Sequence, residues 1–126
     1  MRPRRVGSAE PAMRLLAACI AVFLLSPAAM AGTERCSEPY APVIPDGASA
    51  SAAEIKAVKR EVEQYIRESD DYQSCILAVI ADPDEKMSSQ DKVNAMALIE
   101  ANQREKEEVA AAYNAALRAH KAAKGG

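Results

Sequence analysis

The sequence predicts an all-α protein: an antiparallel, coiled-coil-like hairpin of two helices, preceded by an extended proline-rich segment and a signal peptide. Apolar residues recur with heptad spacing over two long stretches, a short break with Pro83 separates these stretches, and prolines recur every third residue before the first. We expect the hairpin to occupy residues 51–124. Its first helix covers about 51–81, its loop about 82–88 and its second helix about 89–123.

Residues 1–31 have the pattern of a cleavable signal peptide. Arginines form a basic head, an apolar run from Leu15 to Leu25 follows, and Ala29 and Ala31 supply the small residues that signal peptidase requires. We therefore expect cleavage near Ala31-Gly32 and a periplasmic or secreted product. Met13 offers an alternative start for a shorter signal.

Cys19 follows a segment that also fits a lipoprotein box, so lipidation at this cysteine is an alternative. We prefer simple cleavage, because the apolar run continues beyond Cys19, whereas a lipidated cysteine normally closes such a run. An uncleaved anchor would need roughly 20 apolar residues, more than this run contains. We expect no membrane span after cleavage.

The remaining residues 32–126 carry 12 basic and 17 acidic side chains, a net charge of about −5. Nucleic acids and anionic membranes bind basic surfaces, so the composition argues against both as partners. With so few aromatic residues and so many alanines, the core of this domain is thin and needs a disulfide or a partner.

Cleavage removes Cys19 and leaves Cys36 and Cys75 in an oxidising compartment, which predicts a disulfide between them. Closing this loop with a disulfide adds about 3–4 kcal/mol to the free energy of unfolding, because it lowers the entropy of the unfolded chain. A free thiol pair and an intermolecular bridge are the alternatives.

The first helix begins with a capping box formed by Ser51 and Glu54. Its inward face follows two heptad positions: Ile55, Val62, Ser69 and Ile76 at one, and Val58, Tyr65, Tyr72 and Val79 at the other. Ser88 or Ser89 caps the second helix. We expect the inward face of that helix to consist of Met96, Ile99, Gln103, Lys106, Ala110, Tyr113, Leu117 and His120.

Folding the chain about its loop places Tyr72 opposite Ile99, and Ser69 level with Asn102 and Gln103. The middle of the hairpin is then a polar layer of Ser69, Asn102 and Gln103. One interpretation is that these side chains fix the register of the two helices. The other is that they form a contact site for a partner.

Residues 32–50 are predicted to form an extended strap along the hairpin. Ser51 and Cys75 lie about 36 Å apart along a helix, and the 15 residues from Cys36 to Ser51 span roughly 46 Å in polyproline II geometry. The chain therefore reaches Cys75 only if it runs back along the first helix. Pro39, Pro42 and Pro45 follow the polyproline II repeat.

The cysteine and prolines before Gly47, together with Tyr65, Tyr72 to Cys75 and the late Tyr113, resemble a group of short, uncharacterised secreted proteins of proteobacteria. In that group a cysteine-proline strap precedes two helices. The resemblance implies a periplasmic location and a disulfide. It implies no established activity and transfers no active site.

No catalytic motif, phosphate-binding loop or cofactor signature is present in the sequence, so we expect a non-enzyme without metal or cofactor. His120 is the only histidine and is expected to stabilise the end of its helix. The acids of the hairpin loop offer a calcium site as an alternative, but they lack the spacing of a known calcium loop and read better as solvated turn residues: Asp82, Asp84, Glu85 and Asp91.

The sequence thus predicts a helical interaction or structural protein of the bacterial envelope, with a second copy or another envelope protein as its partner. One alternative is a small-ligand or ion carrier whose pocket is lined by Tyr65, Tyr72 and Tyr113 beside the polar layer. Another is a holdase-like chaperone. The specific role does not follow from the sequence.

Overall fold

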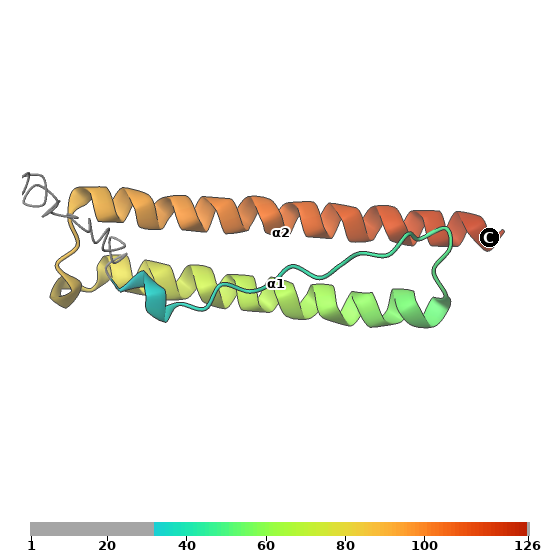
Figure 1. Cartoon of the computed structure of the whole chain (residues 1–126), viewed down its shortest axis with the longest axis horizontal. Coiled ribbons are helices and arrows are strands. Elements are labelled where there is room, and N and C mark those ends of the chain that lie inside the picture. Colours follow the sequence, from blue (N-terminus) through green and yellow to red (C-terminus); the bar gives the residue numbers. More distant parts are fainter. Residues whose placement is uncertain (1–31, 126) are drawn as a thin grey trace, which may run out of the picture.

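The computed structural model describes residues 32–125, and the predicted signal peptide lies outside these residues. Within them the chain forms two long helices, α1 (Ala52–Ala81) and α2 (Ser89–Ala123), and two short 3-10 turns, η2 (Thr33–Arg35) and η3 (Pro83–Glu85), with no strand. The two long helices lie side by side and antiparallel (Figure 1). The predicted helical hairpin is therefore confirmed.

Helix α1 begins at the predicted capping box. The Ser51 hydroxyl accepts a hydrogen bond from the Glu54 N–H at 3.1 Å, and the Glu54 carboxylate accepts one from the Ser51 N–H at 2.6 Å. Donation from the Ser51 N–H, and then interaction with the Ser51 hydroxyl, lowers the pKa of the Glu54 carboxyl group. The helix ends before Asp82, because Pro83 disfavours helical geometry in the residue that precedes it.

Helix α2 begins with a second capping box, which Ser88 forms with Asp91. Between the helices, Lys86 adopts a left-handed conformation with a φ of 51° and turns the chain from η3 towards α2. At the other end, Gly125 has a φ of 73° just after the helix, where glycine relieves the strain that a side chain would cause.

The inward face of α1 matches the predicted heptad positions. All eight predicted residues are buried, and they are the buried residues of this helix: Ile55, Val58, Val62, Tyr65, Ser69, Tyr72, Ile76 and Val79. The heptad pattern of the first helix is therefore confirmed.

The predicted inward face of α2 is partly wrong. The buried residues are Ala95, Asn102, Val109 and Ala116. They precede by one position the predicted residues Met96, Gln103, Ala110 and Leu117, of which Met96 is 42% exposed and the others are half-buried. The remaining predicted positions, Ile99, Lys106, Tyr113 and His120, are also half-buried.

This displacement has a physical cause in the N-terminal segment (residues 32–50), which also packs against α2. Val109 shares a core cluster with residues of α1 and is contacted there by Ile44 of the segment. Ala116 lies against Gly47, where a Cβ atom would collide with the Ala116 backbone carbonyl. The most buried line on α2 therefore lies between α1 and the segment, rather than directly opposite α1.

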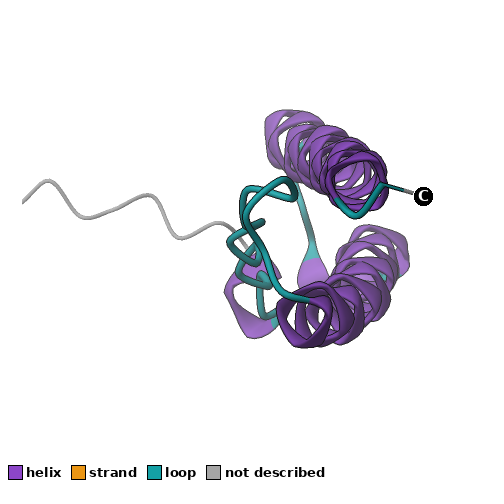
Figure 2. Ribbon diagram, turned by 90° about the vertical axis from the view of Figure 1, so that its right-hand side faces the viewer, coloured by secondary structure: helices purple, strands orange, loops and turns teal. Residues whose placement is uncertain are grey.

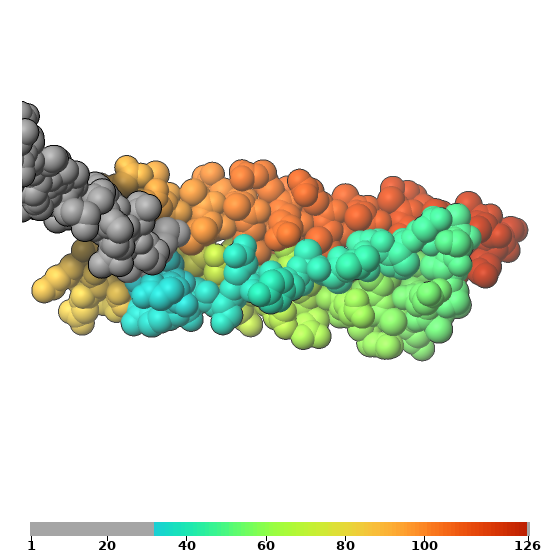
Figure 3. All heavy atoms as spheres, in the orientation of Figure 1, coloured from blue at the N-terminus to red at the C-terminus, as the bar shows by residue number. Residues whose placement is uncertain are grey.

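The N-terminal segment runs the length of the hairpin. From Ser37 to Asp46 it contains neither helix nor strand, and it passes from the end of α1 towards the end of α2 (Figure 1). An end-on view shows it on one side of the helix pair only (Figure 2). In the space-filling view the segment follows the junction between the two helices (Figure 3).

A tight turn then returns the chain to α1. The Asp46 carboxylate accepts a hydrogen bond from the Ala48 N–H at 3.1 Å, and the Asp46 carbonyl accepts one from the Ala50 N–H at 2.9 Å. A ring nitrogen of His120 lies 3.1 Å from the Ala50 carbonyl. The turn is thus joined to the last part of α2.

The interior consists of two apolar clusters with a polar layer between them. One cluster contains Cys36, Tyr72, Ile76, Val79 and Ala95. The other contains Val58, Val62, Tyr65 and Val109. Neither α1 nor α2 has the length and apolar character needed to cross a bilayer.

Candidate functional site

Cys36 and Cys75 form a disulfide, as predicted, and their Cα atoms are 5.7 Å apart. The sulfur of Cys36 joins the N-terminal segment to α1 within the cluster that also contains Tyr72 and Ile76. Since 39 residues separate the two cysteines, the bridge closes a loop that includes the segment and most of α1. The bridge fixes the start of the segment.

The polar layer has its centre at Ser69 and Asn102, whose exposed fractions are 0% and 1%. The Asn102 amide donates a hydrogen bond to the Ser69 hydroxyl at 3.3 Å. The Gln73 side-chain amide in turn donates to the side-chain oxygen of Asn102 at 2.8 Å and to the side-chain oxygen of Gln103 at 3.3 Å. The structure therefore brings together the three residues singled out in the sequence, and it adds Gln73 to them.

The layer continues to the surface. Gln103 donates to Glu107 at 2.8 Å, and Lys106 pairs with Asp70 across the helices at 2.6 Å. No buried side-chain nitrogen or oxygen of residues 32–125 lacks a hydrogen-bond partner. Because the layer is satisfied within the chain and is specific to one alignment of the helices, its geometry is that of a register-setting element.

The three predicted tyrosines do not converge on one pocket. Tyr65 and Tyr72 are buried in different clusters, one on each side of the polar layer, and Tyr113 is half-buried beside Val109. The Tyr65 hydroxyl donates to the Glu105 carboxylate at 3.0 Å. Burial, reinforced by this bond, raises the pKa of Tyr65 to about 12. Burial also raises the pKa of Tyr72.

The acidic residues of the loop have structural partners. Asp82 accepts a hydrogen bond from the Asp84 N–H, Asp91 completes the cap of α2, and Glu85 pairs with Arg35. In the part of the chain that the structure describes, no three histidine, cysteine or acidic residues are grouped so as to hold a metal ion.

Five large apolar side chains are exposed, in two places. Tyr40 and Val43 stand out from the N-terminal segment, with exposed fractions of 95% and 88%. Leu77, Val93 and Met96 lie near the loop end of the hairpin. The prediction from sequence missed both groups, because exposure of a single apolar residue depends on where the segment and the helices meet.

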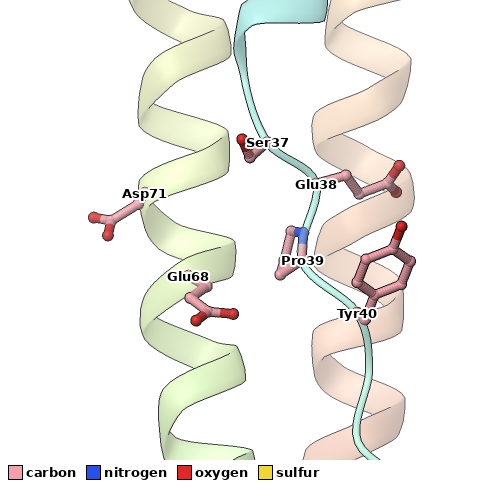
Figure 4. Close-up of a pocket in the computed structure, with 6 residues that line it drawn as sticks. All are labelled: Ser37, Glu38, Pro39, Tyr40, Glu68 and Asp71. Carbon is pink, nitrogen blue, oxygen red and sulfur yellow. The ribbon is translucent and has the colours of Figure 1, made fainter.

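Tyr40 borders a shallow surface hollow between the segment and α1 (Figure 4). The hollow is lined by Ser37, Glu38, Pro39, Tyr40, Glu68 and Asp71. In the close-up, the Tyr40 ring and the Glu38 carboxylate point to the same side, away from α1. A neighbouring hollow adds Glu61 to the acidic side chains around Tyr40.

No family model, curated protein or solved structure matches this chain. The resemblance to small secreted proteins with a cysteine-proline strap therefore stays a prediction.

Proposed function

We propose that this chain is an exported, non-enzymatic interaction protein of the bacterial envelope, built as a disulfide-linked helical hairpin. The observation that carries the proposal is the pair of exposed apolar groups, Tyr40 with Val43 and Leu77 with Val93 and Met96. A small domain that leaves large apolar side chains in solvent while its core is thin gains stability when a partner covers them.

Export is supported by the signal-peptide pattern of residues 1–31 and by the Cys36–Cys75 disulfide, which is typical of oxidising compartments. The polar groups that could serve catalysis have structural contacts instead. His120 contacts a backbone carbonyl, and the carboxylates of Glu105 and Asp91 bond to a tyrosine and a helix cap.

The two alternatives from the sequence have less support in the geometry. A carrier would enclose its ligand, whereas the tyrosines expected to line a pocket pack into separate clusters and the hollow beside Tyr40 lies on the surface. A holdase needs a large continuous apolar surface, whereas the hollows that border Tyr40 are lined by acidic side chains.

Leu77 and the N-terminal segment lie on different sides of α1. Leu77 is two residues beyond Cys75, which is a rotation of about 200° around the helix axis. Leu77 therefore faces away from the N-terminal segment that Cys75 holds. Contact between copies through Leu77 and binding of another protein through Tyr40 are thus separable.

Crosslinking in cells of the native host tests the proposal. A photoreactive residue at position 43 or 77 is expected to give covalent adducts with a protein, and the same residue at Ala111, which is exposed on α2, serves as the control. Light scattering of the purified protein reports association between copies. A strict monomer that forms no adduct from either position contradicts the proposal.

A further inference from the structure

We propose that the exposed edge of the N-terminal segment, formed by Tyr40 and Val43 with a rim of carboxylates, docks a protein partner that offers an apolar pocket bordered by lysine or arginine side chains. This inference rests on the proposed function and names the surface and the chemistry of its partner.

Two apolar side chains of the N-terminal segment are almost fully exposed. Tyr40 is 95% exposed and Val43 is 88% exposed, whereas Pro39, Pro42 and Pro45 of the same segment are half-buried. The prolines therefore lie towards the helices. Tyr40 and Val43 are three residues apart, which is one turn of a polyproline II helix, so they share the outward edge.

The N-terminal segment is held in place before any partner binds. The Cys36–Cys75 disulfide fixes its start, Ile44 packs on the cluster of Val58 and Val62, and Gly47 lies against α2. Proline also fixes φ at three positions of the segment. A backbone that is already held in place loses little conformational freedom on binding. Tyrosine is also enriched among the residues that dominate interfaces.

The surface beside Tyr40 is negatively charged. Glu38, Glu61, Glu68 and Asp71 line the two hollows that border Tyr40. None of these carboxylates forms an ion pair within residues 32–125. A partner with lysine or arginine at matching positions would complement this negative rim, whereas nucleic acid and an anionic membrane surface would be repelled by it.

Tyr40 on the exposed edge of the segment has no structural role in the fold. The Tyr40 hydroxyl makes no hydrogen bond within the described residues, and its ring belongs to neither core cluster. Replacing Tyr40 therefore changes the surface without removing a contact that holds the fold.

The test begins with the full chain in its native host, with a photoreactive residue at position 43 and controls at positions 77 and 111. The captured protein is identified, purified and titrated with the disulfide-bonded hairpin. We expect Tyr40→Ala to weaken binding about tenfold or more. Tyr40→Phe is expected to retain most of the affinity, since it keeps the ring.

Charge is tested separately. We expect Glu38→Lys with Glu68→Lys to weaken binding further as charges are reversed, and we expect the wild-type affinity to fall as salt is raised. Asp84→Lys with Glu100→Lys, at two exposed positions away from Tyr40, is the control with the same change in net charge. Melting curves of Tyr40→Ala and of the charge variants should superimpose on that of the wild type.

The outcomes separate this inference from the proposed function. Adducts from position 77 but not from position 43 overturn the docking edge and leave an interaction protein. Adducts from position 43 with another copy of this chain, or with a protein whose affinity ignores Tyr40→Ala and the charge reversals, also overturn it. The absence of adducts from both positions, together with a strictly monomeric protein in light scattering, overturns the proposed function as well.

Discussion

Asn102 of α2 donates a hydrogen bond to the hydroxyl of Ser69 of α1 across the centre of the hairpin, and both side chains are almost fully buried. This contact aligns the two helices at a single register, because a shift of either helix by one turn would bury both groups without partners. An unpaired buried polar group costs about 1–3 kcal/mol. The stability of the hairpin therefore depends on this pair more than its single hydrogen bond suggests.

The first prediction concerns Asn102→Ala. The substitution removes the buried hydrogen bonds that Asn102 makes with the Ser69 hydroxyl and the Gln73 side-chain amide, so the free energy of unfolding should fall by about 2 kcal/mol in chemical denaturation. Asn114→Ala, at an exposed position of the same helix, is the control and should change it by less than about 0.5 kcal/mol. Equal effects of the two substitutions would show that the polar layer contributes nothing specific.

The second prediction concerns the disulfide. Reduction, or Cys75→Ser, should lower the free energy of unfolding by about 3–4 kcal/mol while most of the helical circular dichroism remains, since the bridge restricts the unfolded chain and fixes the N-terminal segment. Ser74→Ala, at the neighbouring exposed position, should have little effect. An unchanged denaturation midpoint after reduction would contradict this role.

The third prediction concerns Gly47→Ala. The added Cβ atom collides with the backbone of Ala116, and backbone atoms cannot move aside as a flexible side chain does. We expect a loss of about 1–3 kcal/mol and faster proteolysis within residues 37–46. Ala48→Ser, at the exposed next position of the same turn, should leave both measurements unchanged. If Gly47→Ala resisted protease as well as the wild type does, the turn would not need the close approach of Gly47 to the Ala116 backbone.

The fourth prediction concerns pH. The pKa of Tyr65 rises from its ordinary value of 10.0 to about 12 in the folded state. The stability that Tyr65 contributes is fully present below pH 10, where its hydroxyl is protonated in both the folded and the unfolded state. This stability is lost between about pH 10 and 12, where the unfolded state releases the proton first. Stability should therefore fall on the order of 2 kcal/mol across this window.

Tyr65→Phe removes that part of the pH dependence and also the bond to Glu105. Denaturation on both sides of the window, with tyrosinate absorbance as a second readout, measures the difference between the two proteins. Tyr40→Phe, at an exposed ring, is the control and should behave as the wild type in stability. A pH dependence that survives in Tyr65→Phe would assign the effect to another group.

The polar layer shows where sequence reasoning succeeded at the site and where it stopped. Ser69, Asn102 and Gln103 follow from the register, because heptad spacing and a short loop leave one antiparallel alignment. Gln73 and the Lys106–Asp70 pair were missed, since these side chains flank the heptad positions and long polar side chains reach partners that spacing does not specify. The exposed pair of Tyr40 and Val43 carried no signal in the sequence.

The sequence by itself determined the local structure of this protein. The capping box of Ser51 and Glu54, the proline that ends α1 and the pairing of Cys36 with Cys75 depend on a few neighbouring residues or on a count of cysteines. Only the tertiary structure decided which line of α2 is buried. That line is set by two contacts at once, with α1 and with the N-terminal segment, so Asn102 and Val109 lie inside while Met96 is left partly in solvent. The heptad spacing of apolar residues describes how one helix faces one other helix. It cannot predict where a third element, here the N-terminal segment, packs.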